Sequence, residues 1–91
     1  MSKYYIESQA SVIMGIYEGA SAEDAVAALN ADAGGDSTAA DWIILDVVDV
    51  DQDREHGATL YTLENGGVLV ESGPFRDYYP DMSAARAALS D

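Results

Sequence analysis

Two apolar runs separated by polar residues in the first part of the chain predict a pair of strands. Aromatic and β-branched residues gather at positions 4–6 and again at 12–17, which is typical of strands. The polar residues 8–11 separate these two runs, so we expect either a hairpin over residues 3–18 or one long bent strand. Gly15, inside the second run, indicates a bend or a close approach of the backbone.

A helix is predicted after these strands. Ser21 stands three residues before Asp24, a spacing typical of a helix start in which the serine side chain caps the first turn. Gly34 and Gly35 are expected to end the helix. The apolar residues that fall at helical spacing on one face are Ala22, Val26, Leu29 and Ala33.

Strand-like sequence dominates the second half of the chain. Residues 42–50 are dense in β-branched side chains and begin as a continuous apolar run, as a central strand does. Residues 58–63 and 68–71 also have strand composition, and the Asn65-Gly66 pair between them is a strong hairpin signal. We therefore expect three further strands in this half.

The C-terminal part is expected to be a loop followed by a short helix. Gly73-Pro74 is expected to end a strand, and residues 75–80 to form the loop. A helix is expected from about residue 81 or 83 to residue 89. This order of elements favours an α+β fold, with a mostly antiparallel sheet of four or five strands and two short helices. The length of 91 residues predicts a single domain over residues 1–91.

The charge balance is the strongest compositional signal. The chain has 4 Lys+Arg against 17 Asp+Glu, a formal net charge of −13. This charge argues against direct binding to nucleic acid or to an anionic membrane surface, because both are negative themselves. No apolar run approaches the roughly 18 residues of a membrane-spanning helix. The N-terminus leads straight into strand-like sequence, so we expect an intracellular, cytoplasmic protein.

Candidate catalytic and metal-binding groups are weak in this sequence. Asp49, Asp51 and Asp53 match the first three ligand positions of an EF-hand loop, but Arg54 replaces its glycine and Leu60 its final glutamate. His56 is the only histidine, the chain has no cysteine, and the glycine pairs lack the spacing of phosphate-binding loops. We therefore expect a protein that is not an enzyme, with no catalytic residue, metal site or cofactor.

A row of acidic residues is the best candidate for a binding site. If residues 49–55 are extended, Asp49, Asp51, Asp53 and Glu55 project from one strand face at intervals of about 6.6 Å. Asp46 precedes this row on the same predicted strand. Tyr78 and Tyr79 are neighbours that cannot both point inward easily, so one of them is a candidate apolar anchor for a partner.

Size, charge and the row from Asp49 to Glu55 together resemble a class of small, single-domain, strongly acidic phage proteins that mimic DNA, among them anti-CRISPR proteins. The resemblance implies an inhibitor that occupies a basic nucleic-acid-binding surface of a host protein, such as a CRISPR effector, in the host cytoplasm. No functional residue is carried over from the class, because no diagnostic motif is present.

Two other interpretations remain open. Abundant Asp, Ala and Val with a single lysine also describe a domain adapted to a saline cytoplasm, in which acidity says nothing about partners. The acidic row also suits the edge of a sheet, where charge guards against aggregation. The sequence does not indicate the identity of a target or the oligomeric state.

Overall fold

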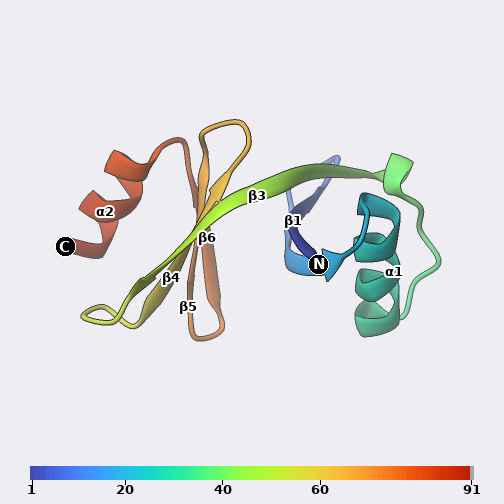
Figure 1. Cartoon of the computed structure of the whole chain (residues 1–91), viewed down its shortest axis with the longest axis horizontal. Coiled ribbons are helices and arrows are strands. Elements are labelled where there is room, and N and C mark those ends of the chain that lie inside the picture. The colour runs from blue at the N-terminus through green and yellow to red at the C-terminus, as the bar shows by residue number, and fades with distance from the viewer. Residues whose placement is uncertain (91) are drawn as a thin grey trace. The chain divides into compact units, whose positions relative to one another are not determined.

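Six strands and two α-helices make up the α+β fold shown in Figure 1, a computed structural model that describes residues 1–90. The sheet order is β2-β1-β3-β4-β5-β6, and every neighbouring pair is antiparallel. The α+β class and the antiparallel sheet are thus confirmed. In chain order the elements are β1 (Ser2–Ser8), β2 (Ile13–Gly19), α1 (Ala22–Ala33), the 3-10 turn η1 (Ala39–Asp41), β3 (Trp42–Asp53), β4 (Ala58–Leu63), β5 (Val68–Ser72), β6 (Phe75–Tyr79) and α2 (Met82–Ser90).

Contacts divide the chain into two units, Met1–Asp46 and Val47–Asp91, and β3 contributes residues to both. Each unit has its own hydrophobic cluster and its own helix. The expectation of a single domain over residues 1–91 stays a prediction.

In the first unit, β1 and β2 form the expected hairpin. The pairing shifts register between Ile6 and Glu7, where Ile6 lies opposite Gly15 and Glu7 lies opposite Ile13. The skipped residue makes a bulge, and Gly15 takes the positive φ of 123° that glycine adopts without a Cβ penalty. The bend that Gly15 indicates in the sequence is therefore confirmed.

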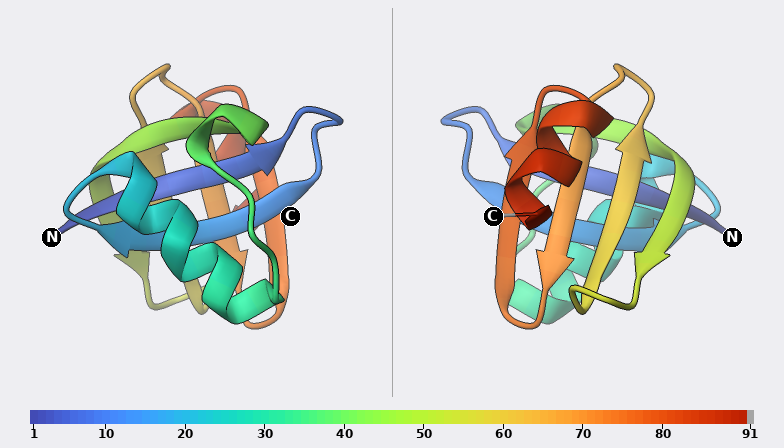
Figure 2. Two further views of the ribbon diagram at one scale, coloured as in Figure 1. Left: turned by 90° about the vertical axis from the view of Figure 1, so that its right-hand side faces the viewer. Right: turned by 90° about the vertical axis from the view of Figure 1, so that its left-hand side faces the viewer.

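Helix α1 covers the hairpin through a narrow apolar stripe (Figure 2, left). It buries Ala25, Val26 and Leu29 against Ile6 of β1, while the expected core residue Ala33 is exposed. Both predicted ends are confirmed. The Ser21 hydroxyl accepts a hydrogen bond from the Asp24 backbone N–H at 3.3 Å, and Gly34 closes the helix in the left-handed conformation.

In the second unit, β4, β5 and β6 form a meander with α2 packed on one face (Figure 2, right). Ala85 of α2 is fully buried in this face, and Asp81 caps the helix by accepting a hydrogen bond from the Ala84 backbone N–H at 2.8 Å. The strand residues that complete the cluster are Ala58, Leu60, Val68 and Val70, with Tyr79, Met82 and Leu89 partly buried against them.

The expected loop over residues 75–80 is wrong, because residues Phe75–Tyr79 form strand β6. Gly73 and Pro74 are the two central residues of a tight hairpin in which Ser72 pairs with Phe75. Gly73 has a φ of 58°, which suits the first central position of a hairpin turn that matches the twist of the strands. The Gly-Pro pair reverses the chain instead of ending the sheet, so the sheet has six strands and not four or five.

The cap of α1 is directly testable. Ser21→Ala should lower the free energy of unfolding by roughly 0.5–2 kcal/mol, because the backbone N–H of Asp24 loses its acceptor. Urea unfolding followed by circular dichroism measures the change. Ser2→Ala, at a strand end, is the control and should have little effect. Equal stability of the Ser21→Ala variant and the parent would mean that the serine does not cap the helix.

Candidate partner-binding surface

Three members of the acidic row lie on one face of β3. Asp49, Asp51 and Asp53 occupy alternate positions in the second half of the strand, so their side chains project to the same side at intervals of about 6.6 Å. In the antiparallel ladder they stand opposite Thr62, Leu60 and Ala58 of β4. The shared face that the alternation predicts is thus confirmed for these three aspartates.

Glu55 does not share this face. Strand β3 ends at Asp53, and residues 54–57 form a turn before β4. The Asp53 carboxylate accepts a hydrogen bond from the His56 backbone N–H at 3.1 Å, and Gly57 has a φ of 64°. An aspartate that accepts from a nearby backbone N–H stabilises a turn, so the chain leaves the extended conformation two residues before Glu55.

Two of the three aspartates have a cationic or hydrogen-bonding partner within the unit. The Arg86 guanidinium of α2 lies 2.6 Å from the Asp51 carboxylate, and the His56 ring donates to Asp53 over 2.9 Å. In the part of the chain that the structure describes, no ion pair joins Asp49 or Glu55 to a cation. The row therefore presents less uncompensated charge than its sequence implies.

The row also lies along a sheet edge within the second unit. In the described residues, the segment after Asp46 pairs with β4 alone, whereas β1 pairs with Trp42–Asp46. A row of charges on such a segment blocks pairing with another chain. This placement favours the interpretation of the row as protection of a sheet edge.

Asp46 belongs to the first unit, where it is exposed and lies opposite Tyr4 in the ladder between β1 and β3. The ladder between β3 and β4 changes register between Val47 and Asp49. Asp46 is thus separated from the other aspartates by a bulge, and it belongs to the part of β3 that pairs with β1.

The two tyrosines of β6 point to opposite faces of the sheet. Tyr79 is partly buried in the cluster under α2, so it serves the core. Tyr78 is 40% exposed, but its hydroxyl accepts a hydrogen bond from the Asn65 side chain at 3.3 Å. Its ring also covers Gly67, where a Cβ would collide with the phenol. Tyr78 is therefore held by the β4–β5 hairpin, and it exposes more surface to a partner than the partly buried Tyr79 does.

Phe75 is an apolar side chain that the sequence analysis missed. It lies beside the Gly73-Pro74 turn at the start of β6 and is 72% exposed. An exposed aromatic ring is a typical anchor at protein interfaces. The signal in the sequence is an aromatic residue directly after a Gly-Pro pair, which marks a hairpin tip once the pair is recognised as a turn.

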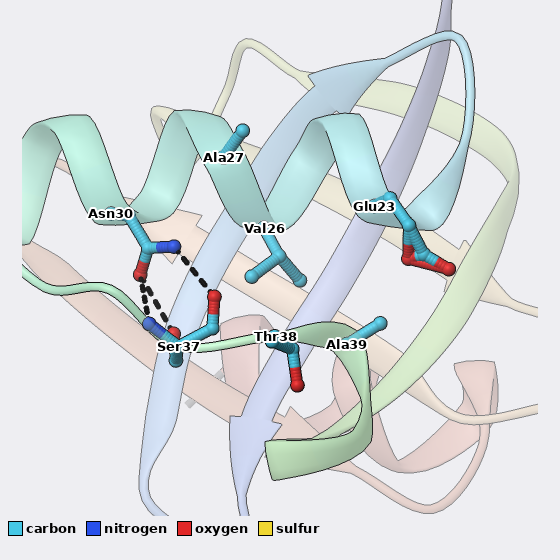
Figure 3. Close-up of a pocket in the computed structure, with 7 residues that line it drawn as sticks. All are labelled: Glu23, Val26, Ala27, Asn30, Ser37, Thr38 and Ala39. Atoms are coloured by element: carbon cyan, nitrogen blue, oxygen red, sulfur yellow. Dashed lines mark hydrogen bonds between the residues drawn. The ribbon is translucent and has the colours of Figure 1, made fainter.

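A cavity of about 200 Å³ in the first unit was also missed (Figure 3). Its wall between α1 and the following segment is held by Asn30, whose side chain donates to the Ser37 carbonyl at 2.8 Å and accepts from the Ser37 hydroxyl at 2.7 Å. Trp42 in turn donates its indole N–H to the Ser37 hydroxyl at 2.8 Å. The lining residues are Glu23, Val26, Ala27, Asn30, Ser37, Thr38 and Ala39.

The described residues contain no group of three or more His, Asp or Glu side chains that could hold a metal ion. Neither α1 nor α2 is both long and apolar enough to cross a membrane. Comparison of the chain with protein-family models, with curated proteins and with solved structures finds no match.

The contact between Asp53 and His56 predicts a pH dependence. The hydrogen bond from the His56 side chain, with a second from its backbone N–H, lowers the pKa of Asp53 below its ordinary value of 3.8. A carboxyl group whose pKa is lower in the folded state stabilises the fold above its unfolded pKa, and this contribution is lost as the pH falls through the folded pKa.

The free energy of unfolding of the parent should therefore exceed that of Asp53→Asn at neutral pH, and the difference should shrink below pH 3.8. Urea unfolding at a series of pH values measures it. The difference between the two free energies of unfolding is the quantity to follow. Protonation of the other carboxylates at low pH relieves their repulsion in both proteins, so that effect cancels in the difference. A difference that stays constant down to the lowest pH would contradict the assignment.

The contact between Gly67 and Tyr78 predicts a second effect. Gly67→Ala should destabilise the protein by about 1–3 kcal/mol, because the added methyl group overlaps the Tyr78 ring. In a Tyr78→Ala background the same change should lose most of its cost. Thermal unfolding of the two single variants and the double variant measures the coupling. Additive effects would show that the tyrosine does not cover the glycine.

Proposed function

We propose that the chain is a non-enzymatic acidic binding protein that mimics nucleic acid and blocks a basic nucleic-acid-binding surface of a host protein. A CRISPR effector in the host cytoplasm is a partner of this kind. The observation that carries the proposal is an acidic charge that local ion pairs leave mostly uncompensated. In the described residues, Lys3 pairs with Glu18 and Arg86 pairs with Asp51, and the His56 ring donates a hydrogen bond to Asp53.

The acidic excess occurs in both units. Residues 1–46 contain eight acidic residues and a single basic one, Lys3. Residues 47–91 contain nine acidic residues and three arginines. Between Lys3 and Arg54 the sequence has no lysine or arginine at all. A surface of this charge attracts a basic groove by long-range steering and pairs best with arginine, whose guanidinium binds carboxylates through two hydrogen bonds.

The mimicry is one of charge density. If the chain forms the single compact domain that its length predicts, that domain is about 30 Å across, judged from a radius of gyration of about 12 Å. Duplex DNA carries roughly 18 charges over that length, which is the same order as the net charge of −13. In the second unit, the proposed contacts are the acidic row (Asp49, Asp51, Asp53 and Glu55) and the exposed parts of Phe75 and Tyr78.

A salt-adapted domain of unknown function is the second candidate. The edge position of the acidic half of β3 is compatible with it, because charge there has a structural use without any partner. The two candidates differ in their need for salt. A mimic that acts in an ordinary cytoplasm should be folded at about 0.15 M salt, where exposed charges are screened beyond about 8 Å. Recovery of the fold only at molar salt would favour salt adaptation.

The proposal is tested by asking whether DNA releases the proteins that the chain captures from a lysate. The purified chain is immobilised, incubated with a bacterial lysate at low salt, and washed with either duplex DNA or an uncharged polymer. We expect DNA to displace the captured proteins and the uncharged polymer to leave them bound. The proposal is wrong if DNA displaces nothing, or if the captured proteins do not bind nucleic acid.

A matched pair of variants tests the acidic row as part of the contact. The first variant neutralises the acidic row by the changes Asp49→Asn, Asp51→Asn, Asp53→Asn and Glu55→Gln. It should associate with a captured partner at least about tenfold more slowly at low salt, because the electrostatic attraction that guides the two proteins together is weaker. The control removes the same four charges elsewhere, at Glu7, Asp32, Asp36 and Asp77. Both variants should remain folded. Equal slowing by the two variants would reduce the row to one part of a diffuse charge.

A further inference from the structure

The cavity beside α1 combines an apolar interior with the carboxylate of Glu23. Val26 points from α1 toward the segment that carries Thr38 and Ala39, whereas the Ala27 side chain points away from that segment (Figure 3), so Val26 and Ala39 supply most of the apolar wall. Glu23 lies at one end, in the first turn of the helix, and no hydrogen bond or ion pair engages its carboxylate within the described residues. A cavity of this composition suits a ligand with an apolar stem and a cationic head.

The other polar groups of the lining are already occupied. The side-chain oxygen of Asn30 accepts hydrogen bonds from the Ser37 backbone N–H and hydroxyl, and the side-chain NH2 of Asn30 donates to the Ser37 backbone carbonyl. The Thr38 backbone N–H donates to Asp41 at 2.8 Å within the turn η1. These bonds hold the walls in place before any ligand arrives, so little ordering is needed on binding.

We propose that this cavity receives an arginine side chain of the protein partner, with its methylene stem against Val26 and Ala39 and its guanidinium on the Glu23 carboxylate. The inference rests on the proposed function, which supplies a basic partner. The volume of about 200 Å³ is below the roughly 300–1,000 Å³ of pockets for drug-sized ligands and cofactors, so a single side chain is the fitting occupant.

Arginine fits better than lysine for two reasons. The guanidinium is planar and binds a carboxylate through two parallel hydrogen bonds, and it loses its hydration more readily than an ammonium group does. The positive end of the α1 dipole opposes any cation near Glu23. The negative charges of Glu23 and Asp24, in the first turn of α1, act against that partial charge.

The probe for this site is N-acetyl-L-arginine methylamide, titrated into the isotope-labelled full chain and followed by the NMR shifts of backbone amides. We expect saturable shifts confined to residues 23–30 and 37–39. The citrulline counterpart, which has a similar shape without the charge, should not produce them, and the lysine counterpart should bind more weakly. Shifts spread over the carboxylates of both units, or equal shifts with citrulline, would overturn the proposal.

Two variants with matched controls separate the carboxylate from the apolar wall. Glu23→Gln should raise the dissociation constant of the arginine probe about threefold, the size expected for one exposed ion pair. Ala27→Leu should weaken the localised shifts by placing a larger side chain on a residue of the lining, and leucine keeps the helix stable. Glu7→Gln makes the same charge change outside the cavity, and Ala31→Leu adds the same volume on the same helix. Both controls should bind as the parent does, and weakening by either control equal to that of its partner would overturn the proposal.

The DNA-reversible capture described above distinguishes this proposal from the proposed function. If the chain captures partners that DNA displaces but the arginine probe does not titrate at the cavity, the cavity proposal is wrong and the proposed function stands. If the probe titrates at the cavity but no captured protein responds to DNA, the cavity stands as an arginine site and the proposed function is wrong. If both hold, Ala27→Leu should reduce capture while Ala31→Leu does not.

Discussion

The backbone ladder of β3 is the interaction on which both units depend. Its first five residues, Trp42–Asp46, pair with β1, and the part beyond the bulge pairs with β4. The chain composition changes along the strand to suit these two settings. The first half is apolar and contributes Trp42 and Ile44 to the cluster under α1, whereas the second half alternates between valine and aspartate. One continuous strand thus serves a covered sheet and an exposed edge.

Electrostatic repulsion is the main opposing force in this protein. With a net charge of −13, the few cations matter by their position. Lys3 lies 2.6 Å from Glu18 across the β1–β2 hairpin and lowers the pKa of that glutamate, and Arg86 connects α2 to Asp51. Exposed pairs of this kind each contribute little to stability. Their effect is to compensate charge where two elements of one unit meet, and the rest of the surface stays strongly acidic.

Polar and aromatic side chains fall into two groups, those that make hydrogen bonds within the fold and those that are exposed without such bonds. Asn30, Asp53 and Tyr78 are engaged with the backbone or with neighbouring side chains, so they stabilise loops and hairpins. Glu23 and Phe75 are exposed without such a role in the bonds and core clusters described above. The second group is better suited to recognition, because binding there does not require the fold to give up an existing contact.

The sequence by itself determined the local features of this protein. Ser21 and Gly34 set the ends of α1, Asn65-Gly66 forms a hairpin, and Gly15 forms a bend, because each depends on the backbone preferences of a few adjacent residues. The α+β class followed from the order of these elements. The net charge also came from the sequence, since it needs no structure.

Tertiary structure decided everything that depends on residues distant in the chain. The Gly73-Pro74 pair starts a sixth strand only because β5 is present to pair with Phe75–Tyr79. Part of the charge of the acidic row is compensated, because α2 brings Arg86 to Asp51, which lies 35 positions earlier in the chain. The walls of the cavity are fixed because the Asn30–Ser37 bonds tie the following segment to α1. Periodicity and charge counts describe one stretch of chain at a time, so they cannot show which side chains the fold will bring together.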